Sequence, residues 1–137
     1  MKRRRHLLDF SGTLFASAVA TGVDALIYTT MILVWVNAGM LSVGLAASVG
    51  AVVGGLVHYG LCRFWVFRRF QAPIVSSFPL YLVMSWLAAA AHGVLTHWLS
   101  GLAGVALGWL ISKAVLWICW TYPMSRFVVF YDQKSST

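Results

Sequence analysis

The stretch HYGLCRFWVF, residues 58–67, recurs 63 residues later as TYPMSRFVVF, residues 121–130. Five positions are identical in the two copies: Tyr59, Arg63, Phe64, Val66 and Phe67 match Tyr122, Arg126, Phe127, Val129 and Phe130. Each copy closes a long apolar run at its polar edge, where an arginine extends its charge towards lipid headgroups and aromatic rings lie at the interface. The planar guanidinium also matches phosphate oxygens. Arg63 and Arg126 are therefore candidates both for helix anchoring and for binding a phosphate.

The composition places the chain in a lipid bilayer. Hydrophobic residues make up 61% of its 137 positions and charged residues 9%, whereas soluble domains carry roughly 25% charged residues. So few charges cannot cover a soluble surface. The net charge of +7 raises nucleic acid as a partner, but the basic residues cluster at positions 2–5, 63–69 and 126–134, beside apolar runs. Cytoplasmic anchoring explains this distribution better than nucleic-acid binding does.

The apolar runs predict an all-α membrane protein with four transmembrane helices, at residues 10–36, 41–67, 74–98 and 102–130. Uncharged turns are expected at residues 37–39 and 100–101, whereas basic residues flank the N-terminus, the middle loop and the C-terminus. This asymmetry predicts that both termini are cytoplasmic, and that residues 1–137 form one multi-pass domain in the cytoplasmic (inner) membrane. The recurrence at 63 residues predicts a parallel repeat of two helical hairpins.

Asp24 and Lys113 are the only acid and the only lysine deep inside apolar spans. Each lies 13 or 14 residues from the basic edge of its span, which is about 20 Å along an ideal helix. An ionisable group at this depth costs roughly 3 kcal/mol or more, so the two are expected to form an ion pair. A structural pair and a substrate path are equally good interpretations. Trp117 shares a helix face with Lys113 and either stacks on a sugar ring or fills space, and Thr121 follows one turn later.

The second span carries residues with mainly structural interpretations. Small residues recur at four-residue spacing on the face that also carries His58: Ala46, Gly50 and Gly54. This spacing predicts close helix packing, with His58 buried and hydrogen-bonded, and with a phosphate contact as the alternative role. His92 and His97 are placed near the opposite side of the membrane. The sequence shows no metal-binding motif, phosphate loop or acid–base pair, so no metal, no cofactor and no enzymatic activity are expected.

The chain resembles the GtrA-like family. The resemblance rests on an acid in the first span (Thr21-Gly22-Val23-Asp24), a lysine in the fourth (Ser112-Lys113-Ala114) and the two Arg-Phe-x-Val-Phe endings. The family's usual endings read Asn-Phe-x-x-Asn-Arg-x-x-Val-Phe. Here the asparagines are replaced by His58, Cys62, Thr121 and Ser125. The resemblance implies translocation of a polyprenyl-phosphate-linked sugar across the membrane, for cell-wall or surface polysaccharide synthesis.

The candidate site has two parts. The phosphate-binding candidates are Arg63, Arg126 and His58, and the candidates for the substrate path or ion pair are Asp24, Lys113, Trp117 and Thr121. A small proton-coupled exporter of the multidrug type is an alternative function, although its membrane acid would have to release a proton without a fixed counter-charge. A non-transporting scaffold or partner subunit is another. Four helices enclose little space, so a homodimer is expected. Membrane lipids and a membrane glycosyltransferase are further candidate partners, and nucleic acid is not one.

Overall fold

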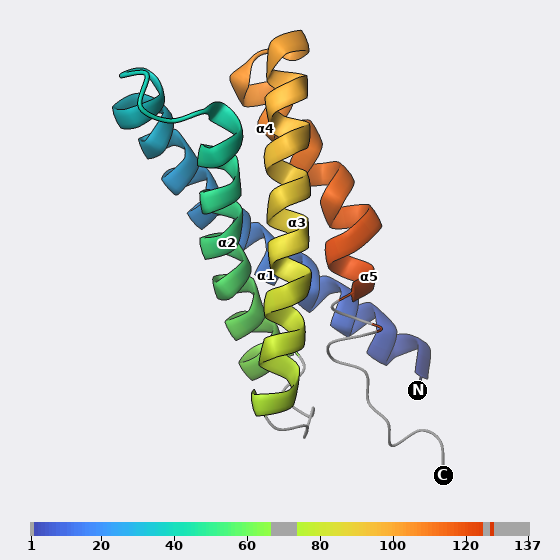
Figure 1. The fold of residues 1–137 in the computed structure, drawn as a ribbon. Helices are drawn as coiled ribbons and strands as arrows, with labels where there is room; N and C mark the ends of the chain where they lie inside the picture. The colour runs from blue at the N-terminus through green and yellow to red at the C-terminus, as the bar shows by residue number, and fades with distance from the viewer. Residues whose placement is uncertain (1, 67–73, 125–126, 128–137) are drawn as a thin grey trace.

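The computed structural model describes residues 2–66, 74–124 and 127, and all regular structure among these residues is helical. The four principal helices are α1 (Lys2–Met31), α2 (Val43–Leu61), α3 (Ile74–Ala103) and α4 (Val105–Leu116) (Figure 1). The π-helical turns η1 (Ile32–Val36), η2 (Cys62–Val66) and η3 (Trp117–Thr121) extend α1, α2 and α4. The short α5 (Tyr122–Met124) follows η3.

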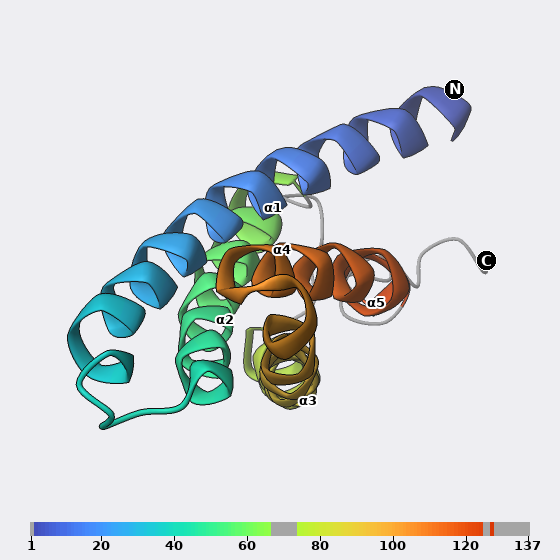
Figure 2. The same ribbon diagram turned by 90° about the horizontal axis from the view of Figure 1, so that it is seen from above.

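The helices form one bundle in which α2 packs against both α1 and α3, and α3 packs against α4. The N-terminal end of α1, the beginning of α3 and α5 lie at the same end of this bundle (Figure 1). Figure 2 shows that α1 crosses the other helices obliquely and that its N-terminal part extends beyond them. The described chain therefore traverses the bundle four times and returns to the end at which it starts.

The prediction of an all-α membrane protein with four spanning helices is confirmed. The segments long and apolar enough to cross a bilayer are Phe10–Val36, Val43–Val66, Phe78–Ala103 and Val105–Met124. Large apolar side chains point outwards, and Leu26 and Leu102 are 72% and 84% exposed. The largest fully buried side chains are instead mostly polar: Thr13, Asp24, Cys62, His92, Thr96 and Ser112. A polar interior beneath an apolar exterior is the distribution expected where lipid surrounds the bundle.

The turn between α3 and α4 corrects the prediction from sequence. A turn is expected at residues 100–101, but α3 continues through both residues to Ala103. The chain reverses at Gly104, whose φ of 89° lies in the left-handed region that glycine adopts without strain. A helix tolerates a single glycine at a cost of about 1 kcal/mol relative to alanine. Gly101 can therefore stay helical, and the pair at residues 100–101 does not mark the end of the span.

The two repeated endings share local features where both are described. Phe64 lies in η2, and Phe127 also has π-helical backbone. Both rings face outwards, at 68% and 64% exposure. In the second ending, the π-helical turn η3 ends at Thr121, two residues before Pro123, a residue that has no N–H to donate to the helix.

Candidate functional site

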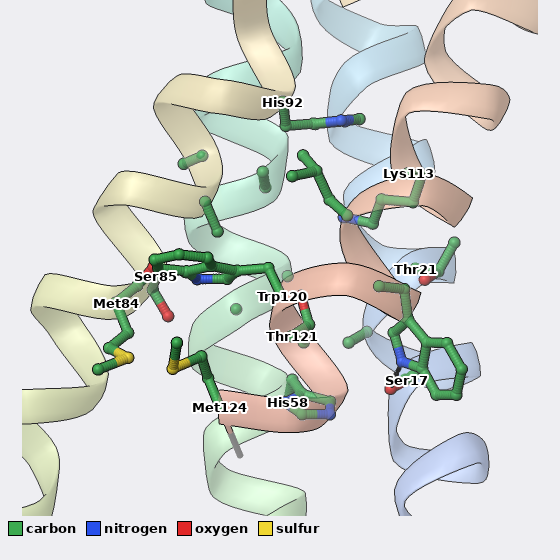
Figure 3. A pocket seen from close by; sticks show the side chains of 18 of the residues that line it. Ser17, Thr21, His58, Met84, Ser85, His92, Lys113, Trp120, Thr121 and Met124 are labelled. Carbon is green, nitrogen blue, oxygen red and sulfur yellow. Dashed lines mark hydrogen bonds between the residues drawn. The ribbon is translucent and has the colours of Figure 1, made fainter. Parts of the chain in front are cut away.

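A cavity lies between the helices, and α1, α2, α3 and α4 all contribute to its wall. About 700 Å³ of space not filled by protein atoms lies in and around it, counting the open solvent at its mouth. His92 and Lys113 lie at one end of the cavity, and His58 and Met124 lie at the other (Figure 3). Other polar or aromatic lining residues are Ser17, Thr21, Tyr81, Ser85, Trp117, Trp120 and Thr121.

The inner end of the cavity is marked by an ion pair. The ammonium of Lys113 donates to Oδ2 of Asp24, so the ion pair expected from their depths is present. The Asp24 side chain is fully buried, whereas that of Lys113 is 24% exposed and lines the cavity. Asp24 is enclosed from the α2 side because a Cβ at Gly50 would overlap Oδ1 of Asp24. The carboxylate is therefore behind the wall, and the ammonium is the part of the pair that faces the cavity.

Two further contacts join α1 to α4 on either side of this pair. Tyr28 and Trp109 lie one helical turn from the pair, on the side of Gly104, and their rings stack with centroids 5.7 Å apart. On the other side, the indole N–H of Trp117 donates to the hydroxyl of Ser17. These contacts bridge two helices that approach each other less closely than either approaches its packing partner. Trp117 thus lines the cavity and also braces α1.

His58 lies in the cavity wall with both ring nitrogens in hydrogen-bonding contact. Its Nδ1 is 3.2 Å from the hydroxyl of Tyr81, and its Nε2 is 3.5 Å from Sγ of Cys62. The Tyr81 hydroxyl donates to the carbonyl of Gly55 at 2.9 Å, so it accepts from Nδ1–H of His58. The bare Nε2 then accepts from the thiol of Cys62. The buried, hydrogen-bonded histidine expected at position 58 is confirmed, and its phosphate role stays a prediction.

His92 lies deeper in the bundle than the sequence analysis places it, so that placement is wrong. Its side chain is 2% exposed and lines the inner end of the cavity. The reason is the length of α3, which ends 11 residues later at Ala103, about 16 Å away along the helix. Nδ1 of His92 is 3.0 Å from the hydroxyl of Ser112. The sequence feature that could have indicated this buried position is the series of polar residues His92, Thr96 and Ser112 within otherwise apolar spans.

The structure brings together some of the candidate residues and separates others. The cavity wall contains His58, Lys113, Trp117 and Thr121, with Asp24 paired behind it. Arg63 is half-buried in η2 and is not one of the lining residues. Arg126 lies outside the described residues. Sequence reasoning missed Tyr81, which reaches from α3 to the backbone of Gly55. Trp120, three residues after Trp117, also lines the cavity, and its indole N–H donates to the carbonyl of Met84 at 3.1 Å.

Four apolar helices around a polar, ion-paired interior define a multi-pass integral membrane protein. Within that class, the sequence matches the GtrA/DPMS transmembrane domain family over residues 14–130, and the chain belongs to this family. No curated protein and no solved structure matches it. The match covers most of the first span, all of the other three, the ion pair and both repeated endings, so the resemblance to the GtrA-like family is confirmed.

Proposed function

We propose that this protein translocates a polyprenyl-phosphate-linked sugar across the cytoplasmic membrane. The observation that carries the proposal is the cavity, which runs from the end of the bundle where α2 and α5 finish to Lys113 near the middle of the fourth span. A hydroxyl-rich sugar needs polar partners to leave water, and this wall offers them at a depth where lipid offers none. Membership of the GtrA/DPMS transmembrane domain family is consistent with this role.

In this proposal the two ends of the substrate bind to different parts of the protein. The sugar occupies the cavity, and the phosphate stays near the basic edge of the bundle, where the repeated endings carry Arg63 and Arg126. A guanidinium fork suits phosphate oxygens, and the polyprenyl chain remains in the surrounding lipid. His58 contributes less to phosphate binding than the arginines, because both of its nitrogens are engaged with Tyr81 and Cys62.

A proton-coupled exporter is a weaker candidate on the same geometry. Its membrane acid must exchange a proton with the substrate path. Asp24 is fully buried and paired with Lys113, which stands between the carboxylate and the cavity. The group that faces the path is therefore a cation, which favours a substrate with oxygen acceptors over a cationic drug.

The test is a flipping assay in liposomes that contain the purified protein and a fluorescent polyprenyl-phosphate-linked hexose. Two matched variants on α3 probe the cavity. Ala88 lines the cavity, whereas Ala90 is exposed on the outside of the bundle and is not one of the lining residues. Ala88→Phe is expected to fill the cavity and reduce the flipping rate at least tenfold, and Ala90→Phe is expected to leave the rate unchanged.

Two results would contradict the proposal. Equal flipping rates in Ala88→Phe and the unmodified protein would show that substrate does not pass through this cavity. A complete lack of flipping by the unmodified protein, together with stable co-purification of a membrane glycosyltransferase, would favour a partner subunit instead.

A further inference from the structure

We propose that His92 binds a hydroxyl group of the sugar at the inner end of the cavity, with Nε2 as the hydrogen-bond acceptor. The inference rests on the proposed function and adds a specific contact to it. The His92 side chain is 2% exposed, lines the cavity and points from α3 towards α4 (Figure 3). Among the residues that the structure describes, Nε2 of His92 has no hydrogen-bond partner. A buried polar atom without a partner is costly, and because His92 is one of the residues that line the cavity, a ligand bound there can supply that partner.

The neighbouring hydroxyls determine which nitrogen of His92 carries the proton. Oγ of Ser112 contacts the carbonyl of Trp109 at 2.9 Å, Oγ1 of Thr96 at 2.7 Å and Nδ1 of His92 at 3.0 Å. The carbonyl has no proton to give, so the single proton of Ser112 goes to it. Ser112 therefore accepts from Thr96 and from Nδ1–H of His92. Nε2 is then left unprotonated, with its lone pair free to accept.

Lys113 supplies the complementary group at the same end of the cavity. Its ammonium has three protons, one of which is directed at Asp24, and the side chain is 24% exposed and lines the cavity. A ligand that fits both residues needs a donor for Nε2 of His92 and an acceptor for the ammonium. A sugar hydroxyl is both at once, whereas a phosphate dianion offers acceptors alone. The pair therefore selects the sugar end of the substrate.

His58 lines the same cavity but differs from His92 in its hydrogen bonds. Both of its nitrogens have partners, in Tyr81 and Cys62, so it offers no free acceptor. Of the two histidines that line the cavity, His92 is the one equipped to bind a ligand without losing an existing hydrogen bond.

The test compares binding of two kinds of probe to purified protein in nanodiscs. One is farnesyl phosphate, and the other is farnesyl phosphate carrying glucose, galactose or mannose. His92→Asn keeps an amide at the position of Nδ1, which can bond Ser112, but removes the atom at Nε2. His92→Gln places its amide near the position of Nε2. His97→Asn is the matched control, because His97 is on the same helix and is exposed.

His92→Asn is expected to weaken binding of the best sugar probe about fivefold to tenfold, the loss of one hydrogen bond, and to leave binding of farnesyl phosphate unchanged. His92→Gln should retain most of the affinity, and His97→Asn all of it. An equal loss for both probes, or no loss for either, would overturn the inference while leaving the proposed function intact. Failure of the unmodified protein to bind any of the sugar probes would overturn both.

A second measurement avoids substitution altogether. In ¹⁵N spectra of the unmodified protein, His92 should show an unprotonated Nε2 whose resonance shifts when the glucose, galactose or mannose probe is added. The resonance should not shift with farnesyl phosphate. A protonated Nε2 in the ligand-free protein would overturn the inference.

Discussion

Lys113 of α4 forms an ion pair with Asp24 of α1, although 89 residues separate them in the sequence. The two members are unequally placed. The carboxylate is fully buried against α2, whereas the ammonium belongs partly to the cavity wall. Because the cavity can admit water, a lone ammonium there has a source of solvation that a lone carboxylate at position 24 lacks. The pair is therefore electrostatically asymmetric.

Breaking the pair from its two sides should have different costs. Lys113→Met leaves a fully buried carboxylate without a counter-charge and is expected to destabilise the bundle by about 3–5 kcal/mol. Asp24→Asn leaves the ammonium facing the cavity and should cost less. Both effects can be measured as loss of thermal stability of the purified protein in detergent.

The double variant Asp24→Asn with Lys113→Met provides the control for these two substitutions. Removing both charges should recover most of the stability lost in Lys113→Met alone, because no uncompensated charge remains. If the double variant is less stable than the worse single variant, the two side chains do not stabilise each other. Restored flipping in the double variant would assign the pair to structure alone, and absent flipping with restored stability would place Lys113 in the substrate path.

Gly54 allows α1 and α2 to pack closely, and its substitution should separate them. A Cβ at this position would come within 2.9 Å of the carbonyl oxygen of Ala20 and 3.0 Å of Cβ of Asp24. Gly54→Ala is therefore expected to destabilise the protein by about 1–3 kcal/mol. Gly60 is on the same helix, and a Cβ at this residue would meet no other atom within 4 Å beyond its chain neighbours and its own helix backbone. Gly60→Ala should be neutral or slightly stabilising, since alanine is the better helix former. Equal melting temperatures for the two variants would contradict the close contact.

The spans and the ion pair could be predicted because both depend on distance along a straight helix. Apolar runs have to be about 20 residues long to cross a bilayer, so their number follows from the sequence. Asp24 and Lys113 lie at similar distances from the ends of their runs, and antiparallel helices bring equal depths together. The four-residue spacing of Gly50 and Gly54 likewise fixes a common face, although it does not identify α1 as the helix packed against it.

The turn at Gly104 and the depth of His92 in the bundle could not be predicted in the same way. Ser100, Gly101 and Gly104 all permit a turn, and the choice among them depends on where α4 packs against α3. Once that turn moves by three residues, the depth assigned to His92 changes with it. The cavity depends on the lateral arrangement of four helices, which hydropathy along one chain does not encode. For that reason His58 was recognised from its helix face, whereas Tyr81 and His92 were not.

The orientation of the bundle is predicted from the charges that flank the spans. Met40 and Leu102 are 74% and 84% exposed and lie beside the two uncharged turns. In a variant without Cys62 and Cys119, single cysteines at these two positions should react with an impermeant maleimide added outside intact cells. A cysteine at Gln71, which lies outside the described residues, should react only after the cells are opened. Labelling of position 71 from outside would contradict the predicted orientation.

Arg63 and Arg126 are predicted to bind the substrate phosphate as well as to anchor the helices. Lysine keeps the positive charge and its attraction to headgroups but loses the planar fork that binds two phosphate oxygens together. Arg63→Lys and Arg126→Lys should therefore insert normally and lower the flipping rate by about tenfold, with weaker binding of farnesyl phosphate. Phe64→Leu is a suitable control, because this 68% exposed ring directly follows Arg63 and carries no charge. Normal flipping in both lysine variants would leave helix anchoring as the whole role of these arginines.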